Sequence, residues 1–163
     1  MMQIGESFVG DGVNAAHVNT VLGERDGPVG TAWATALATP TSGHAPFVAT
    51  LRPSLALTPP TLFVNKAAIT GGRHAELTWG AAQAGLALGV RDALADRTIA
   101  PGAVGRLVLI AAVWVSPDAD DAAAVCKNNR AATSAALRAG SAGRPTVEEL
   151  IAVEDATNAF YPR

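Results

Sequence analysis

The chain has 163 residues, of which 49% are hydrophobic and 16% are charged, and its formal net charge is -2. This length fits one domain with a buried core, and the scattered lysine and arginine side chains form no basic patch for nucleic acid. No apolar run approaches the roughly 20 residues of a membrane helix and the N-terminus lacks signal-peptide features, so we expect a cytoplasmic protein that binds neither nucleic acid nor membrane.

The first predicted structural feature is a tight loop at Val9-Gly10-Asp11-Gly12. Its two glycines can adopt positive φ at little steric cost, and the aspartate can hydrogen-bond to its local backbone. The alternating residues 15–22 that follow predict a half-buried strand. His17 lies near the start of this strand, and we therefore expect it on a rigid element beside a loop.

The rest of the chain predicts a mixture of helices and strands, separated by proline and glycine residues. In chain order, we expect a helix over 29–37, strands over 46–51 and 61–69, a helix over 79–96, a strand over 106–115, a helix from about 116 to 138, and a short acidic helix over 147–153. Ser116-Pro117-Asp118 has the residue types of a helix N-terminus. This order favours a single α+β domain, a two-layer α/β sandwich over residues 1–140, followed by a C-terminal extension over 141–163.

Common catalytic and metal-binding motifs are missing from the sequence. It contains no Gly-x-x-x-x-Gly-Lys, Gly-x-Ser-x-Gly or Cys-x-x-Cys, and its three histidines are far apart. The acidic residues at 118–121 could suggest a cation site, but favourable placement at a helix N-terminus explains them more simply. Cys126 is typical of a packed or partly exposed thiol. We therefore expect no metal.

Three polar side chains, His17, Lys66 and Gln83, lie in otherwise apolar segments. A histidine satisfied within the structure, an edge lysine with its ammonium in solvent and a surface glutamine would each be ordinary. In the functional interpretation, the histidine is a general acid or base, and the glutamine both donates to and accepts from an amide-bearing heterocycle. If the fold brings them together, the three side chains form a small-molecule site.

Several short motifs, in one order over roughly residues 4–140, resemble those of the formaldehyde-activating enzyme family. The motifs are Ile4-Gly5-Glu6-Ser7-Phe8-Val9-Gly10-Asp11-Gly12, Ala16-His17, Gly27-Pro28-Val29-Gly30, Gly43-His44, Arg52-Pro53-Ser54-Leu55, Asn65-Lys66 and Trp79-Gly80-Ala81-Ala82-Gln83.

The resemblance implies a cytoplasmic homopentamer with a fold related to the second domain of ribosomal protein S5. It implies condensation of formaldehyde with tetrahydromethanopterin, as substrate, to the methylene derivative and water, with His17 as the proton donor. The implied substrate-binding positions are Asn19, Val48, Lys66, Ala68 and Gln83. Two of them depart from the family pattern, because Asn19 replaces an aspartate and Ala68 replaces a threonine.

The chemistry of this reaction suits a histidine. Loss of hydroxide from a carbinolamine needs a proton, and an imidazole with a pKa near 6.5 can supply it at neutral pH. Two alternatives stay open. The residues at positions 19 and 68 motivate a formaldehyde- or pterin-binding or sensing paralogue with little or no turnover. The alanine-rich, weakly charged composition, which also favours association of several copies, motivates a structural ring protein.

Overall fold

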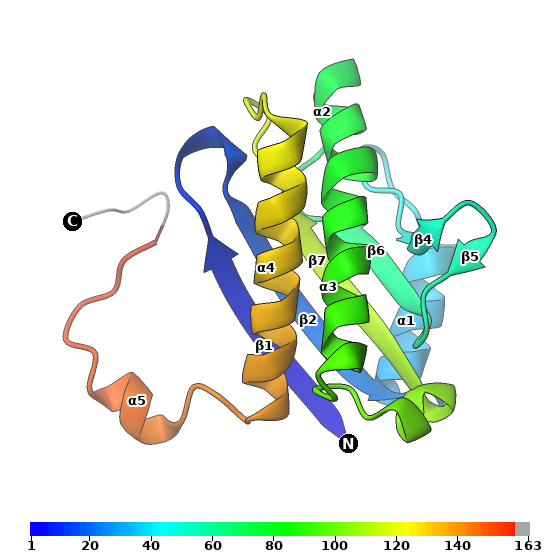
Figure 1. The fold of residues 1–163 in the computed structure, drawn as a ribbon, viewed down its shortest axis with the longest axis vertical. Helices are drawn as coiled ribbons and strands as arrows, with labels where there is room; N and C mark the ends of the chain where they lie inside the picture. Colours follow the sequence, from blue (N-terminus) through cyan, green and yellow to red (C-terminus); the bar gives the residue numbers. More distant parts are fainter. Residues whose placement is uncertain (159–163) are drawn as a thin grey trace.

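A five-stranded sheet organises residues 1–158, the part of the chain that the computed structural model describes. The strand order is β1-β2-β7-β6-β3, and neighbouring strands are antiparallel except for the parallel pair β6 and β7. The bounds are β1 (Met2–Val9), β2 (Ala16–Glu24), β3 (Phe47–Val48), β6 (Thr61–Asn65) and β7 (Leu107–Trp114). A separate hairpin pairs β4 (Thr50–Arg52) with β5 (Leu55–Ala56) (Figure 1).

Two long helices, α3 (Gln83–Ala95) and α4 (Ala122–Ser141), lie side by side over one face of the sheet (Figure 1). One continuous helical segment leads into α3, formed by α2 (Gly72–Glu76) and the π-helical turn η2 (Leu77–Ala82). The smaller helical elements are η1 (Gly12–Asn14), η3 (Pro101–Arg106) and α5 (Val147–Ile151). This arrangement confirms the α+β prediction, whereas the relationship to ribosomal protein S5 stays a prediction.

The first helix, α1 (Pro28–Ala38), packs on the opposite face of the sheet. Leu22 belongs to the core under α3 and α4, and its neighbour Gly23 must point the other way because side chains alternate along a strand. A Cβ at Gly23 would lie 2.5 Å from the Val29 side chain of α1. The helix therefore covers only one end of this second face, and the other end stays open.

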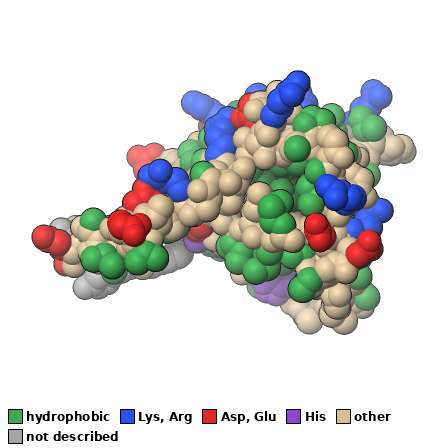
Figure 2. All heavy atoms as spheres, turned by 90° about the horizontal axis from the view of Figure 1, so that it is seen from below, with side chains coloured by type: hydrophobic (Ala, Val, Ile, Leu, Met, Phe, Trp, Pro, Cys, Tyr) green, Lys and Arg blue, Asp and Glu red, His purple; other side chains and the backbone are tan. Residues whose placement is uncertain are grey.

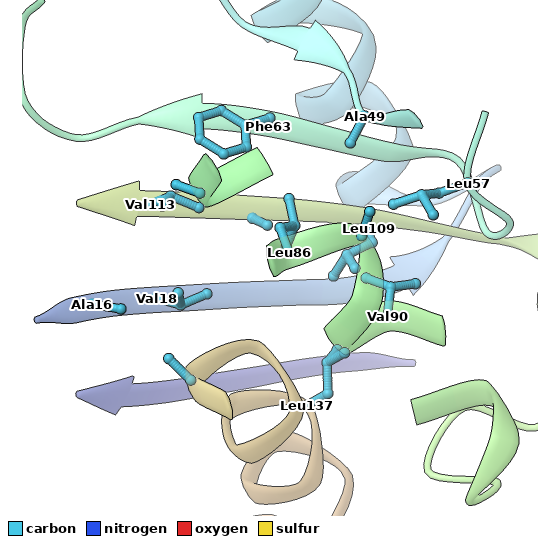
Figure 3. Close-up of a cluster of buried hydrophobic side chains, with 14 of the residues drawn as sticks. Ala16, Val18, Ala49, Leu57, Phe63, Leu86, Val90, Leu109, Val113 and Leu137 are labelled. Carbon is cyan, nitrogen blue, oxygen red and sulfur yellow. The ribbon is translucent and has the colours of Figure 1, made fainter. Parts of the chain in front are cut away.

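The core lies between the sheet and the two long helices (Figure 3). Alternate residues of β2, including Ala16 and Val18, point toward α3 and α4, where they meet Leu86 and Val90. Strict alternation then places the intervening residues, His17 among them, on the open face. Burial of one face of β2 therefore determines which side chains the other face presents to a ligand.

Small residues set the close approach of α4 to the sheet and to α3. A Cβ at Gly5 would lie 1.8 Å from the Ala136 carbonyl oxygen, and one at Gly85 would lie 2.3 Å from the Cys126 carbonyl oxygen. Neither position can carry a side chain without displacing backbone. These small residues therefore allow α4 to pack closely against the sheet and against α3.

Strand β1 was not among the predicted strands. Its inward-facing residues include Gly5 and Ser7, so no alternating apolar signal faces the core. The apolar side chains of this strand, such as Ile4 and Phe8, are exposed on the open face. In β1, small and polar residues therefore face the helices and large apolar residues face outward, the reverse of the usual arrangement for a strand packed under a helix.

Two helix starts also differ from the prediction. The helix predicted to begin at Trp79 begins at Gly72. The final long helix begins at Ala122, and the Asp121 carboxylate accepts hydrogen bonds from the Ala123 and Ala124 amides. Ser116 instead forms a turn before it, in which its side-chain oxygen accepts from the Asp118 amide. The N-cap is therefore Asp121, downstream of the predicted Ser116.

Candidate active site

The candidate site lies on the open face of the sheet, at the end where β1 turns into β2. Gly10 and Gly12 adopt positive φ values of 84° and 60°, which confirms the predicted tight loop. The turn starts the antiparallel pairing of the two strands, and in this register Phe8 lies opposite His17 and Glu6 lies opposite Asn19. The hairpin therefore brings a carboxylate and an imidazole onto the same face.

A chain of short hydrogen bonds connects four side chains on this face. The Glu6 carboxylate lies 2.9 Å from His17 Nε2, and Lys66 Nζ lies 2.9 Å from His17 Nδ1. The Lys66 ammonium also donates to the Asn19 side-chain oxygen at 2.7 Å. Both imidazole nitrogens are thus engaged, and the ring orientation is fixed from two sides.

The electrostatics of this array change how tightly its two basic groups hold their protons. Burial lowers the pKa of His17, the nearby Lys66 charge lowers it further, and the Glu6 carboxylate opposes both effects. Burial also lowers the pKa of Lys66, again opposed by Glu6. Two basic groups in contact therefore both hold their protons less tightly than in water.

A pocket of about 760 Å³ opens over this array. The size is that of a small-molecule site. Aromatic side chains supply apolar walls, and the Phe8 and His17 rings lie 5.9 Å apart between centroids. The lining residues are Glu6, Phe8, His17, Lys66, Trp114, Thr157 and Asn158. The last two belong to the C-terminal segment, so this segment forms part of the pocket wall.

Lys66 lies one residue beyond the end of β6, not inside a strand as predicted. The strand ends at Asn65, whose side-chain amide donates to the Gly43 and Ala67 carbonyl oxygens. The Lys66 backbone amide still donates to the Val113 carbonyl oxygen of β7 at 2.8 Å. From this anchored position, the long side chain reaches His17 on β2, the strand on the other side of β7.

Of the predicted site residues, His17 and Lys66 line the pocket, and Asn19 joins the array through its contact with Lys66. The other three lie elsewhere within a single chain. Gln83 begins α3 on the helical face of the sheet, and its side-chain amide donates to the Thr50 carbonyl oxygen at 3.0 Å. Val48 lies on the edge strand β3, where it pairs with Leu62. Ala68 is exposed in the loop after β6. The fold thus gathers His17, Asn19 and Lys66, and it leaves the remaining three apart.

Sequence reasoning missed the roles of Glu6, Phe8 and Trp114. A signal for Glu6 existed, because the Gly-Asp-Gly turn predicts a hairpin whose two strands share an open face. In such a hairpin, Glu6 is the diagonal neighbour of His17, within reach of a long side chain. Trp114 pairs with His17 across β2 and β7, and only the sheet order reveals that contact.

The described residues contain no cluster of three or more metal-ligating side chains. His44 Nδ1 lies 2.9 Å from the Asn65 carbonyl oxygen, and His74 Nε2 lies 3.1 Å from the Val115 carbonyl oxygen. The three histidines thus occupy different environments. Among the same residues, no helix is both long and apolar enough to cross a bilayer.

A family model described as formaldehyde-activating enzyme (Fae) matches residues 4–161, nearly the whole chain. The chain belongs to the formaldehyde-activating enzyme family. The 5,6,7,8-tetrahydromethanopterin hydro-lyase of Methanosarcina barkeri is 38% identical over 155 residues, which are 95% of this chain and 87% of that protein. A bifunctional enzyme Fae/Hps of Archaeoglobus fulgidus is 34% identical over 160 residues, 98% of this chain but 40% of the relative.

The bifunctional relative from Methanosphaerula palustris shows the same proportions, with 34% identity over 95% of this chain and 39% of the relative. The chain therefore corresponds to less than half of these longer enzymes. The family match also continues past Gly140, where the resemblance seen in the short motifs stopped.

Proposed function

We propose that this protein condenses formaldehyde with tetrahydromethanopterin, giving the methylene derivative and water as a carbon–oxygen lyase of the cytoplasm. Its membership of the formaldehyde-activating enzyme family and its similarity to a tetrahydromethanopterin hydro-lyase support the proposal. The structural observation that carries it is the orientation of His17, held by Glu6 and Lys66 at the wall of the pocket.

In the proposed reaction, formaldehyde adds to a ring amine of the reduced pterin and forms a carbinolamine. Protonated His17 gives its proton to the departing hydroxyl, so that water leaves and an iminium ion forms. The second ring amine then attacks the same carbon and closes the ring. The pocket contributes by holding both amines near one carbon. Asn19 and Lys66 contribute polar groups that orient the pterin.

We further propose that the protein is a homo-oligomer, a pentamer, in which Val48, Ala68 and Gln83 of one copy complete the pocket of its neighbour. These three residues lie apart from His17 within one chain, which supports this arrangement. A neighbouring copy would bring them to the ligand that contacts His17, Asn19 and Lys66. Glutamine at position 83 would then contribute its amide to the heterocycle.

Exposed apolar side chains support the association of several copies. On β1, Met2 is 60% exposed, Ile4 is 58% exposed and Phe8 is 43% exposed. The segment that contains α5 extends away from the main body (Figure 2), and its Leu150 and Ile151 are 61% and 79% exposed. Patches of this kind mark interaction surfaces.

The test is a condensation assay that follows free formaldehyde with and without tetrahydromethanopterin. We expect acceleration by the protein, and a loss of about 10²- to 10⁴-fold in the His17→Ala variant because the positioned acid is gone. A melting curve of the variant checks its folding. Tight pterin binding without acceleration by the parent protein would contradict the proposal and indicate a binding or sensing role.

A further inference from the structure

We propose that Lys66 is a nucleophile that captures formaldehyde covalently as an iminium ion, with His17 as its acid–base partner and Glu6 as a positioning residue. The inference rests on the proposed function, because formaldehyde is the electrophile. It adds a covalent intermediate on the protein and an activity that does not require the pterin.

The geometry is that of an activated nucleophile. Such sites place the nucleophile within hydrogen-bond reach of a base, and a third group orients that base. Here Lys66 Nζ lies 2.9 Å from His17 Nδ1, and the Glu6 carboxylate lies 2.9 Å from His17 Nε2 on the far side of the ring. The three side chains come from β1, from β2 and from the loop after β6, so the fold assembles them from separate segments.

The surroundings of Lys66 make loss of its proton easier than it is in water. Among the described residues, no carboxylate lies within ion-pairing distance of Lys66 Nζ. Its short contact at 2.7 Å is to the side-chain oxygen of Asn19, a neutral amide. Burial lowers the pKa of the amine, although the charge of Glu6 opposes this effect. A lysine needs its free lone pair to attack a carbonyl carbon.

Glu6 makes transfer of the proton from Lys66 to His17 easier. When Lys66 gives up a proton across the Nδ1 contact, the imidazole becomes an imidazolium ion. The Glu6 carboxylate accepts a hydrogen bond from Nε2 and stabilises that positive charge. Among the described residues that line the pocket, the titratable side chains are Glu6, His17 and Lys66, and the proton moves within this connected group.

The chemical steps balance without any oxidant or reductant. The Lys66 amine attacks formaldehyde, and after one proton moves from nitrogen to oxygen the product is a carbinolamine. The His17 imidazolium then donates a proton to the hydroxyl group, the carbon–oxygen bond breaks and water leaves. The nitrogen lone pair forms the carbon–nitrogen double bond of a protonated iminium ion.

Transfer of the one-carbon group to the pterin releases it from Lys66. A ring amine attacks the iminium carbon, and the resulting aminal loses the Lys66 amine, which leaves the methylene group on the pterin. The second ring amine closes the bridge and releases a proton. The overall reaction consumes one formaldehyde and two nitrogen–hydrogen bonds and releases one water, as the uncaptured route does.

The sequence provides an internal control, because it contains only two lysines, Lys66 and Lys127. The second is exposed on α4. Limiting formaldehyde and cyanoborohydride, without pterin, reduce any iminium ion to a methyl-lysine that peptide mass spectrometry locates. At near-neutral pH we expect the methylation of Lys66 to exceed that of Lys127 by at least about tenfold, because a base lies within hydrogen-bond reach of the Lys66 amine.

The Asn19→Asp variant tests the environment with nearly unchanged shape. A carboxylate beside Nζ favours the ammonium ion, so methylation of Lys66 near neutral pH falls and recovers as the pH is raised, whereas Lys127 is unaffected. The Lys66→Arg variant keeps the positive charge, and we expect it to lose the adduct and most of the condensation rate. Melting curves establish that both variants fold.

Equal methylation of the two lysines in the parent protein would overturn the inference, as would a parent-like condensation rate in Lys66→Arg. Condensation without any Lys66 adduct would overturn the covalent route alone and leave the proposed function standing. An adduct on Lys66 in a protein that does not accelerate condensation would contradict the proposed function instead, while supporting formaldehyde capture.

Discussion

At the scale of single residues, the protonation of the His17 imidazole depends on surroundings that shift its pKa in opposite directions. Burial and the charge of Lys66 disfavour the imidazolium form of His17, and Glu6 favours it. The balance of these three effects determines the fraction of His17 that carries a transferable proton at a given pH. Glu6 therefore has a measurable role although its side chain is 59% exposed.

Replacement of that carboxylate shifts the pH dependence of the reaction. Because Glu6 raises the pKa of His17, Glu6→Gln lowers this pKa. The rate of a reaction that needs protonated His17 falls as pH rises through its pKa, so the falling limb of kcat/KM moves to lower pH in the variant. Glu76→Gln is the matched control, since its carboxylate pairs with Arg73 away from the pocket. A limb at the same pH in both variants would exclude the role of Glu6.

At the scale of helices and strands, the contact of α3 with α4 holds the layer above the sheet. Arg130 and Arg138 of α4 reach Asp92 and Asp96 at the C-terminal end of α3. Beneath these exposed pairs, small residues permit close packing. The sequence predicted both helices, α3 from apolar periodicity and α4 from its alanine-rich composition, but it misplaced their starts, and the identity of the packed positions came from the structure.

Two glycines on the same helical segment distinguish close packing from helix propensity. In Gly85→Ala, the new methyl group meets the Cys126 carbonyl oxygen, and we expect destabilisation of about 1–3 kcal/mol from overpacking. In Gly80→Ala, the new methyl group meets no described atom within 4 Å beyond its chain neighbours and the backbone of its own helix, so a gain of up to about 1 kcal/mol follows from propensity. Denaturant unfolding at one protein concentration measures both. Equal effects would contradict the packing argument.

The end of α3 contributes a pH-dependent part of the stability. Hydrogen bonds from Thr98, followed by the contact with Arg138, lower the pKa of Asp96 from 3.8 to about 2. A carboxylate with a lowered pKa stabilises the fold above its unfolded-state value, and this contribution is lost as pH falls from 3.8 toward 2. Asp96→Asn is expected to lower Tm near neutral pH. The difference in Tm between the variant and the parent protein should disappear as the pH approaches the folded-state pKa of Asp96. A constant difference would contradict the linkage.

At the scale of the whole molecule, apolar side chains are exposed on two separate elements. The apolar side chains of α5 and β1 are largely exposed. Part of the same open face carries the pocket, so association of copies and completion of the site are coupled in the proposed assembly.

Charge on α5 tests the assembly. We expect Leu150→Asp to reduce the oligomeric state in analytical ultracentrifugation, since association would bury a carboxylate in an apolar contact. Glu148→Asp, on the same helix, adds no charge and serves as the control. An unchanged sedimentation coefficient for Leu150→Asp would exclude α5 from the interface.

Mixed oligomers test whether neighbouring copies share a site. His17→Ala and Gln83→Ala are each expected to be nearly inactive alone. After joint refolding of equal amounts, about one quarter of the interfaces in a ring combine an intact His17 with an intact Gln83 of the next copy. Activity should recover to about that fraction of the parent value. Failure to recover, with mixed oligomers shown by mass spectrometry, would contradict shared sites.

The sequence by itself determined features that depend on neighbours along the chain. Glycines that tolerate positive φ specified the turn at residues 10–12. Apolar periodicity indicated one long helix, and alanine-rich composition indicated the other. Short motifs in one order were enough to indicate the family, which the match over residues 4–161 confirmed. The inverted pattern of β1 and the start of α4 escaped because close backbone packing and a competing cap overrode the local signals.

Only the tertiary structure decided which of the singled-out residues meet. Strand alternation and hairpin register place Glu6 beside His17, and the sheet order lets Lys66 reach the same imidazole from beyond β6. The same sheet separates Gln83 from them, because α3 packs on its other face. Sequence periodicity divides the residues of a strand between two faces. The helices that pack on one face determine which face stays open to bind a ligand.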